Sequence, residues 1–558
     1  MNLEEYLQDC DRRFDRDVQL VGMKYVSPGY HTQTPTGTWV HPVLQNFEYA
    51  VLLLRRRAPV DPERARAIIG RLLLLQDQDP VRPTYGIWPW LFEEPLEKMA
   101  PPDWNWADFC GGRICELLVE SAGLLPKETV ARLREALGHA AAAIFRRNMG
   151  PAYTNIAVMG GGVCAAAGEI LDQPWLLDYG RRRLQSCVGH TEFHGGFNEY
   201  NSPTYTIVVV NECERILSIV RDHEVRESAT RLHRLAWQAI SEHFHPVTGQ
   251  WAGPQARTYA DRLTAATADI LSVRTGVPIS AARGGAEEAW MARANLTVRP
   301  LPCPPEFVSS FREPIAQPVE RVHRFLRHAD DQFSVRGTTW LTRDLCLGSV
   351  NREDFFYQRR PVLAYWRTEE DPAILLKLRF LHDGADFASA LIRSAQCANR
   401  VLSAMNLLTD RGDRHPYFDQ PGPDGFSVND LRLRYEISGR GVQTEDLGQG
   451  LYGLNAGAWS AVIHTLPGTF GPWKVQWKLG SENDECWLDA ICYSGPTIQL
   501  QREHFGEIAV AVGLELIPRN ATSSSRHPCW QPPSPESSRV VWEDLSVTLP
   551  RRPEKYPN

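Results

Sequence analysis

The sequence lacks the features that mark several large classes of protein. It has no run approaching the ~20 apolar residues of a membrane-spanning helix, and its start, Met1–Asp17, has neither the basic nor the apolar region of a secretory signal. Its formal charge of −7 leaves no basic footprint for nucleic acid. We therefore expect a cytoplasmic protein that binds neither membrane nor nucleic acid. The charge does not exclude an acidic ligand, because local arginines can bind one inside a pocket.

Clustered cysteines and metal-ligand spacings are also missing. The 12 cysteines are scattered without a CxxC pair, so we expect reduced thiols and no disulfide framework. His243-Phe-His245 offers two imidazoles, whereas a structural zinc site normally has four ligands. The sequence therefore predicts no metal and no cofactor.

Tryptophan is abundant by contrast, with 17 residues in a chain of 558. Tryptophan fills cores, and it also stacks on the apolar faces of sugars. A chain of this length exceeds one ordinary core, so more than one domain is expected.

The first half of the chain has the apolar spacing of amphipathic helices. Pro and Gly interrupt the pattern at short intervals, which predicts antiparallel helical hairpins. We expect a domain over residues 1–297 that forms an α/α toroid. Its predicted helices are Phe47–Arg56, Glu63–Gln76, Phe109–Ala122, Lys127–Asn148, Ile156–Leu171, Thr204–Arg221, Glu224–His243 and Thr258–Thr275.

The pattern changes after the Pro-rich stretch Val298–Pro305. Short β-like runs separated by turn residues predict an antiparallel β-sandwich over residues 298–558. A helix is expected locally at Phe387–Leu402. The predicted strands are Phe333–Arg336, Thr338–Leu341, Trp459–His464, Val475–Leu479, Thr497–Gln501, Ile508–Ile517 and Val540–Leu549.

Polar and aromatic residues gather at several predicted helix ends. The first group is predicted to bind substrate and consists of Trp88, Trp90, Asp103, Asn105 and Trp106. The structural alternative is a Trp-rich loop packed into the core, with Asp103 capping a helix.

The second group is the segment His194–Tyr205, which contains a Gly-Gly turn and the sequence Glu199-Tyr-Asn-Ser-Pro-Thr-Tyr205. Ser202 is a natural N-cap before Pro203, and Asn201 is a natural turn former. The density of functional groups favours a catalytic segment, with Glu199 and Asn201 binding substrate.

Further candidates lie at three other positions. Asn155 begins a helix, where capping is the structural alternative. Arg257 and Tyr259 lie on a loop before a helix, and a guanidinium binds a carboxylate through two parallel hydrogen bonds. In the β half, Gln358, Arg359 and Arg360 are predicted to reach the helical cleft and bind substrate, with a solvated strand edge as the alternative.

Helical hairpins followed by a β domain, with the Gly-Gly/Glu/Ser/Tyr segment, resemble the heparinase II/III and alginate lyase group of polysaccharide lyases. The resemblance implies a toroid packed against a β-sandwich, with Tyr205 as the proton carrier and Asn155 neutralising a uronate carboxylate. It also implies that Arg257 assists there. The group often has His directly after that Asn, whereas this chain has Ile156, so we expect His190 or His194 to supply the imidazole.

The implied reaction is β-elimination from a uronate-containing poly- or oligosaccharide. It removes the proton at C5 and expels the oxygen at C4, and neutralising the carboxylate stabilises the enolate-like intermediate. Tyr205 then needs a lowered pKa, which nearby Arg or His⁺ provides.

Three alternatives remain open at this stage. A glycoside hydrolase would use two carboxylates separated by about 5–9.5 Å, drawn from Glu93, Glu94, Asp103, Asp108 and Glu199. A uronate epimerase would begin with the same proton abstraction. A carbohydrate-binding protein without activity would account for the tryptophans.

Overall fold

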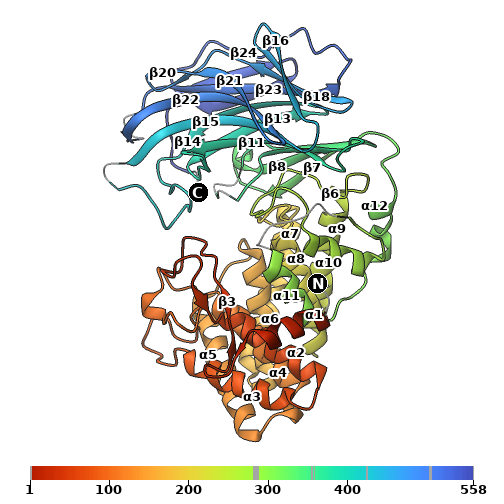
Figure 1. Cartoon of the computed structure of the whole chain (residues 1–558), viewed down its shortest axis with the longest axis vertical. Coiled ribbons are helices and arrows are strands. Elements are labelled where there is room, and N and C mark those ends of the chain that lie inside the picture. The colour runs from red at the N-terminus through yellow and green to blue at the C-terminus, as the bar shows by residue number, and fades with distance from the viewer. Residues whose placement is uncertain are drawn as a thin grey trace.

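The protein consists of a helical domain followed by an antiparallel β-sandwich (Figure 1). The computed structural model describes residues 3–280, 288–353, 356, 358–422, 425–501 and 505–556. The predicted architecture, an α/α toroid before a β-sandwich, is confirmed. The point where the spacing of apolar residues changes from helical to β-like corresponds to this change of architecture.

The helical domain is built from antiparallel hairpins in which every second helix lies inside. The inner helices α2, α4, α6 and α8 contact each other in turn, and each pairs with the outer helix that follows it. The ring is completed by α10 and α11, because α11 contacts α2. The bounds are α1 Leu3–Arg12, α2 Val43–Arg56, α3 Asp61–Leu72, α4 Trp106–Glu120, α5 Lys127–Arg147, α6 Thr154–Leu171, α7 Pro174–His194, α8 Tyr205–Ile219, α9 His223–His243, α10 Ala265–Thr275 and α11 Glu288–Thr297.

Helix α6 is the most apolar of the inner helices. It is long and apolar enough to cross a membrane by length and composition, which the sequence analysis did not anticipate. However, 83% of this window is buried inside the protein. Its three consecutive glycines face neighbouring side chains, and a Cβ at Gly162 would lie 2.5 Å from Ile216 of α8. Small residues therefore allow α6 to pack closely at the centre of the domain.

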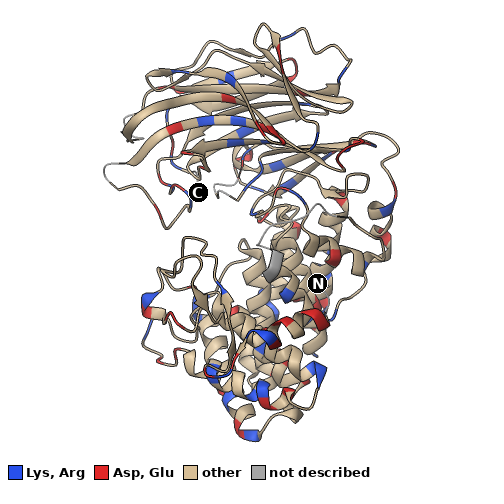
Figure 2. Ribbon diagram, viewed as in Figure 1, with Lys and Arg blue, Asp and Glu red and all other residues tan. Residues whose placement is uncertain are grey.

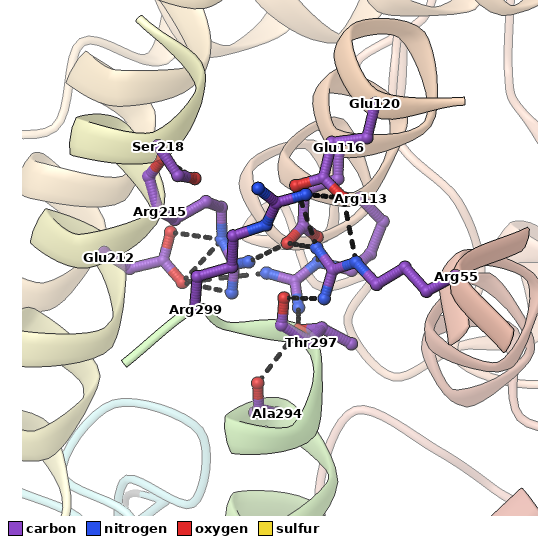
Figure 3. Close-up of polar contacts among 10 residues, drawn as sticks. All are labelled: Arg55, Arg113, Glu116, Glu120, Glu212, Arg215, Ser218, Ala294, Thr297 and Arg299. Atoms are coloured by element: carbon purple, nitrogen blue, oxygen red, sulfur yellow. Dashed lines mark hydrogen bonds and ion pairs between the residues drawn. The ribbon is translucent and has the colours of Figure 1, made fainter. Parts of the chain in front are cut away.

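Buried ion pairs join the inner helices where the ring closes (Figure 3). The Arg215 guanidinium of α8 contacts Glu116 of α4 at 2.6 Å and Glu212 at 3.2 Å. Arg113 donates to Thr297 Oγ1 at the end of α11 at 2.6 Å, and Arg55 of α2 donates to the carbonyl of the same residue. These contacts tie α2, α4, α8 and α11 together. Figure 2 shows both signs of charge intermingled over the helical domain.

The β-sandwich consists of two antiparallel sheets that enclose one apolar core. One sheet runs β21-β22-β15-β11-β10-β9-β8-β7, and the other runs β13-β14-β23-β18-β17-β16. A smaller sheet, β24-β25-β26, packs outside the second sheet. The strands are β7 Val319–Leu326, β8 Val335–Leu341, β9 Leu345–Val350, β10 Val362–Trp366, β11 Ile374–His382, β13 Ala390–Cys397, β14 Arg400–Leu407, β15 Phe426–Ser438, β16 Gln443–Gly448, β17 Leu451–Ala456, β18 Trp459–Thr465, β21 Gln476–Glu482, β22 Glu485–Leu500, β23 Ile508–Pro518, β24 Cys529–Trp530, β25 Ser537–Trp542 and β26 Leu545–Pro550.

Two local features differ from expectation. The helix predicted at Phe387–Leu402 is wrong: these residues form most of the hairpin β13–β14, whose second strand also pairs with β23. Pairing on both sides of β14 outweighs the helix propensity of the Ala and Leu residues there. The helical core also extends past residue 297, since Cys303 and Phe311 belong to it.

Candidate active site

The segment between α7 and α8 is locked to the loop that follows β6 (Gln250–Trp251). Gly195 has φ 90° and ends α7, as a C-terminal glycine does. Ser202 Oγ accepts the backbone N–H of Tyr205 at 3.0 Å, which is the capping contact expected from the sequence. The same hydroxyl donates to the carbonyl of Arg257 at 2.9 Å. One serine therefore fixes both the start of α8 and the loop that carries Arg257.

Asn201 strengthens this connection. Its side-chain amide donates to the carbonyls of Ala252 at 2.8 Å and Pro254 at 2.6 Å, and its Oδ1 accepts the Trp251 indole N–H at 2.5 Å. The residue is buried, with φ 47° in the left-handed region. Asn201 was expected to bind substrate, but its amide is fully occupied in holding the loop.

Tyr205, Tyr259, Arg257 and Gln358 meet at one point. The Tyr205 and Tyr259 hydroxyls are 2.8 Å apart, and Arg257 Nη2 donates to the Tyr205 hydroxyl at 3.1 Å. Gln358 Oε1, from the β domain, accepts Arg257 Nε at 3.2 Å. Four of the residues predicted from sequence therefore form one hydrogen-bonded cluster across the two domains.

The acidity of Tyr205 differs from the expectation. Burial raises the pKa of Tyr205 well above its usual value, and Tyr259 raises it further, while the Arg257 charge acts in the opposite direction. The prediction of a lowered pKa is wrong, because removing the phenol from water costs more than one neighbouring cation returns. At neutral pH Tyr205 is therefore a protonated phenol.

Arg257 is a buried cation in an aromatic setting. Its guanidinium lies 4.0 Å from the centre of the Phe356 ring and 4.9 Å from that of Tyr205. Burial lowers its pKa, but interactions with Tyr205, Tyr259 and Glu199 outweigh this, so that the pKa is raised and the residue stays charged. Within the described parts of the chain, no salt bridge to Arg257 is formed. Because buried charges are normally paired, this cation is suited to an anionic ligand.

Asn155 and Glu199 form a second, adjoining pair. Asn155 Nδ2 donates to both Glu199 oxygens, at 2.9 and 2.7 Å, and the backbone N–H of Asn155 adds a third bond at 3.0 Å. The carboxylate therefore lies at the N-terminus of α6, where the helix dipole favours negative charge. Asn155 Oδ1 is buried without a hydrogen bond. Asn155 thus presents an acceptor to the site, since Glu199 already occupies its amide group.

Tyr153 joins this pair to the rest of the site. The pKa of Tyr153 is raised to about 12. Burial is the main cause, the charge of Arg257 opposes it, and the charges of Glu199 and Asp103 add to it. Its hydroxyl accepts Asn105 Nδ2 at 3.4 Å, and Asn105 Oδ1 accepts Arg147 Nη1 at 2.5 Å. Tyr153, which directly precedes α6 and was not among the predicted residues, therefore belongs to the site.

A row of rings leads from the predicted tryptophan group to Arg257. Trp90 lies 5.1 Å from Trp106 and 5.2 Å from His31 between ring centres. His31 lies 5.0 Å from Phe418, which stacks on His415 at 4.0 Å. The row ends with Phe356, 5.9 Å from His415. Half-buried and exposed rings in a row suit the apolar faces of a chain of sugars.

His415 brings an imidazole to this site from the loop between β14 and β15. Its Nδ1 accepts the backbone N–H groups of Tyr417 at 3.2 Å and Phe418 at 3.3 Å, so the neutral ring carries its proton on Nε2. Burial, together with the charges of Arg257 and His31, lowers the pKa of His415 to about 4. The sequence signal was a His-Pro-Tyr-Phe cluster between two strands.

His194 is placed elsewhere. Its Nδ1 accepts the backbone N–H of Arg327 at 2.9 Å, and its ring lies 4.2 Å from that of His190. Within the described residues, neither histidine contacts Tyr205 or Arg257. The assignment of His194 to the catalytic group is therefore corrected, because the C-terminal end of α7 faces the strand β7.

Three predicted substrate contacts are structural residues. Trp88 is fully buried in the helical core, where its indole donates to the Leu72 carbonyl at 3.0 Å. Arg359 is buried in the β domain against Glu353 and the carbonyls of Phe387 and Ala390. Arg360 pairs with Asp261 through two nitrogens. All three side chains lie inside the protein and bond protein groups, and none lies at a solvated strand edge.

The carboxylates considered for a hydrolase are largely engaged. Asp103 accepts the Trp90 indole N–H at 3.1 Å and the Asn105 backbone N–H at 3.0 Å. Glu94 accepts from Thr32 and Gln33, and Glu93 from His41. Burial raises the pKa of Asp108 to about 7, which Arg183 and Arg147 oppose.

The fold and the site together define a two-domain protein of the toroid and β-sandwich class, with a cluster of tyrosines around Arg257 where the two domains meet. The chain belongs to the family described as a domain of unknown function, DUF8769, whose model matches residues 4–293. No curated protein sequence matches it.

Several solved structures are similar in arrangement. Heparinase III is 11% identical, with a match that covers 95% of this chain and 85% of that chain at a TM-score of 0.40. Heparan sulfate lyase HepC from Pedobacter heparinus is 8% identical over 91% of this chain and 82% of that chain, at 0.34. A GH76 α-mannanase from Bacteroides thetaiotaomicron is 10% identical over 46% and 74%, at 0.29.

Proposed function

We propose that the protein is a lyase that cleaves a uronate-containing poly- or oligosaccharide by β-elimination. The observation that carries this proposal is the buried Arg257 guanidinium, which has a hydrogen bond to Tyr205 and no salt bridge among the described residues. A uronate carboxylate would supply the missing negative charge. Its C5 proton would then lie beside the Tyr205 hydroxyl.

The residues of the cluster have complementary roles in this reaction. The phenolate of Tyr205, stabilised by Arg257, takes the proton from C5. The C4–O bond breaks, and the Tyr205 hydroxyl returns the proton to the departing O4. Arg257 and the Nε2–H of His415 stabilise the charge that develops on the carboxylate. Gln358 and Asn201 position Arg257, and the ring row from Trp106 to Phe418 holds neighbouring sugars.

The test is a screen of heparan sulfate, hyaluronan and alginate, with ultraviolet absorbance as the readout. Elimination leaves a double bond between C4 and C5 that absorbs in the ultraviolet, and it incorporates no water. Tyr205→Phe should reduce the rate by ~10²–10⁴-fold, because general acid–base catalysis is lost. Tyr85→Phe is a matched control, since that phenol bonds His139 at 2.7 Å instead. Full activity of Tyr205→Phe would refute the mechanism.

A glycoside hydrolase is the second candidate. It is favoured by two carboxylates, Glu199 and Asp103, which both lie close enough to Tyr153 to raise the pKa of its hydroxyl. A hydrolase would release an ordinary reducing end without ultraviolet absorbance. It would also lose activity with Glu199→Gln while Tyr205→Phe stayed active.

A further inference from the structure

A second cavity lies in the helical domain, among residues separate from those of the Tyr205 cluster. It has a volume of about 320 Å³, opens to solvent, and is lined by residues of α1, α2, α11 and the strand pair β3 (Met23–Lys24) and β4 (Trp39–Val40). This volume is within the range of small-molecule sites, about 300–1,000 Å³. Its lining combines an indole with several polar side chains.

Three of the residues that line this cavity carry buried polar atoms without hydrogen bonds. The Tyr6 hydroxyl and Gln45 Oε1 are buried without a conventional hydrogen bond, and both side chains are 3% exposed. The Tyr6 hydroxyl interacts with the thiol of Cys10, which is a weak hydrogen-bond partner. Arg293 Nε is also without a hydrogen bond and lies 3.6 Å from Glu48. Because leaving such groups unsatisfied is costly, their presence together indicates a ligand.

The aromatic wall of the cavity is Trp39, which is 50% exposed. A Cβ on Gly22 would lie 2.4 Å from the Trp39 indole nitrogen, so the glycine allows the indole to lie against the backbone. One face of the ring is thereby fixed against the protein. The other is left for an apolar ligand surface.

The charges around the cavity are balanced. Asp9 is bonded to Arg12 and Arg13, and Arg293 pairs with the buried Glu48. Lys24 and Glu5, of opposite sign, are exposed at the rim. The groups without conventional hydrogen bonds are an acceptor (Gln45 Oε1), a donor (Arg293 Nε–H) and a hydroxyl that can do both (Tyr6). A ligand that fits them is uncharged, has a flat apolar face and carries several hydroxyls.

We propose that this cavity is a second carbohydrate-binding site, which takes a single neutral sugar ring. The ring packs its C–H face on Trp39, and its hydroxyls bond Gln45 Oε1, Arg293 Nε–H and the Tyr6 hydroxyl. The proposal does not depend on the reaction at Tyr205.

The test measures binding of glucose, galactose, mannose and N-acetylglucosamine to the full chain by saturation-transfer NMR. We expect saturable binding of at least one sugar, about tenfold weaker in Trp39→Ala, which is the size of an aromatic stacking contribution. Gln45→Leu should weaken it as well, and it should stay folded because it removes an unsatisfied polar atom. Trp175→Ala is the matched control, since Trp175 is 49% exposed on α7.

Separate outcomes distinguish this site from the catalytic one. Binding that persists in Tyr205→Phe supports the second site whether or not the lyase proposal holds. The proposal is overturned if none of the four sugars binds, if Trp39→Ala and Gln45→Leu bind as the wild type does, or if glucuronate binds more tightly than every neutral sugar. If none of the four sugars binds, we would conclude that water occupies the cavity.

Discussion

Tyr205 is subject to two opposing influences on its acidity. Burial disfavours the phenolate, whereas Arg257, bonded to the same hydroxyl, favours it. Burial has the larger effect, so the phenolate is a minor species at neutral pH. A residue that must first lose its own proton makes the rate depend on pH.

We therefore expect the elimination rate to rise with pH across about pH 6–9, close to tenfold per pH unit while pH stays below the Tyr205 pKa. Arg257→Gln removes the cation that lowers this pKa, so the rate at any given pH should fall by at least about tenfold. Initial rates followed by ultraviolet absorbance test both points. Arg182→Gln is the control, because Arg182 lies exposed on α7.

His415 could also affect how the elimination rate depends on pH, at the acidic end of the range. With a pKa of about 4, its imidazole is neutral throughout this range and its Nε2–H remains a donor. It should contribute no acidic limb above about pH 5. A rate that is flat or falls between pH 7 and about 9 would contradict the role given to the Tyr205 phenolate.

At the level of helices, the ion pairs of Figure 3 hold the inner ring together. Arg215→Met removes one cation that contacts both Glu116 and Glu212, while Arg113 still pairs with the two carboxylates. Removing one partner of a buried pair costs about 3–5 kcal/mol, and the remaining Arg113 keeps the loss at the lower end of this range. We expect a loss of this size in the free energy of unfolding of the helical domain, measured by urea denaturation. Arg231→Met, which breaks the exposed pair with Glu192, should cost less than about 1 kcal/mol. Equal losses for the two variants would show that the network does not stabilise the ring.

The apolar spacing predicted most of the helices but missed α7. Its buried positions follow helical spacing, yet they include Gly180, Arg183 and Thr191, which hide the pattern. Gly180 is required there because a Cβ would lie 2.5 Å from the backbone of Ala165 in α6. Close packing of two helices thus selected residues that periodicity alone does not reveal.

For the molecule as a whole, the order of the two domains followed from the change in periodicity, while the full site did not. Tyr205 lies at the start of α8, and Arg257 and Tyr259 lie on one loop before α10, so short sequence motifs can indicate them. Phe356 and His415 reach them from the β domain, more than 95 residues further along the chain than Tyr259. The local sequence does not indicate that these residues meet in space, because the packing between the two domains brings them together.

The missing counter-ion of Arg257 also has a thermodynamic consequence. If the substrate carboxylate neutralises a charge buried in the empty protein, ligand binding and folding are linked, and a bound carboxylate adds about 2.7 kcal/mol to stability at 100 times its dissociation constant. Glucuronate should then raise the unfolding temperature more than glucuronamide, and Arg257→Gln should abolish the difference. An equal shift from both compounds would mean that the carboxylate is not recognised. Melting curves would in this way identify the acid that the protein recognises before any product is seen.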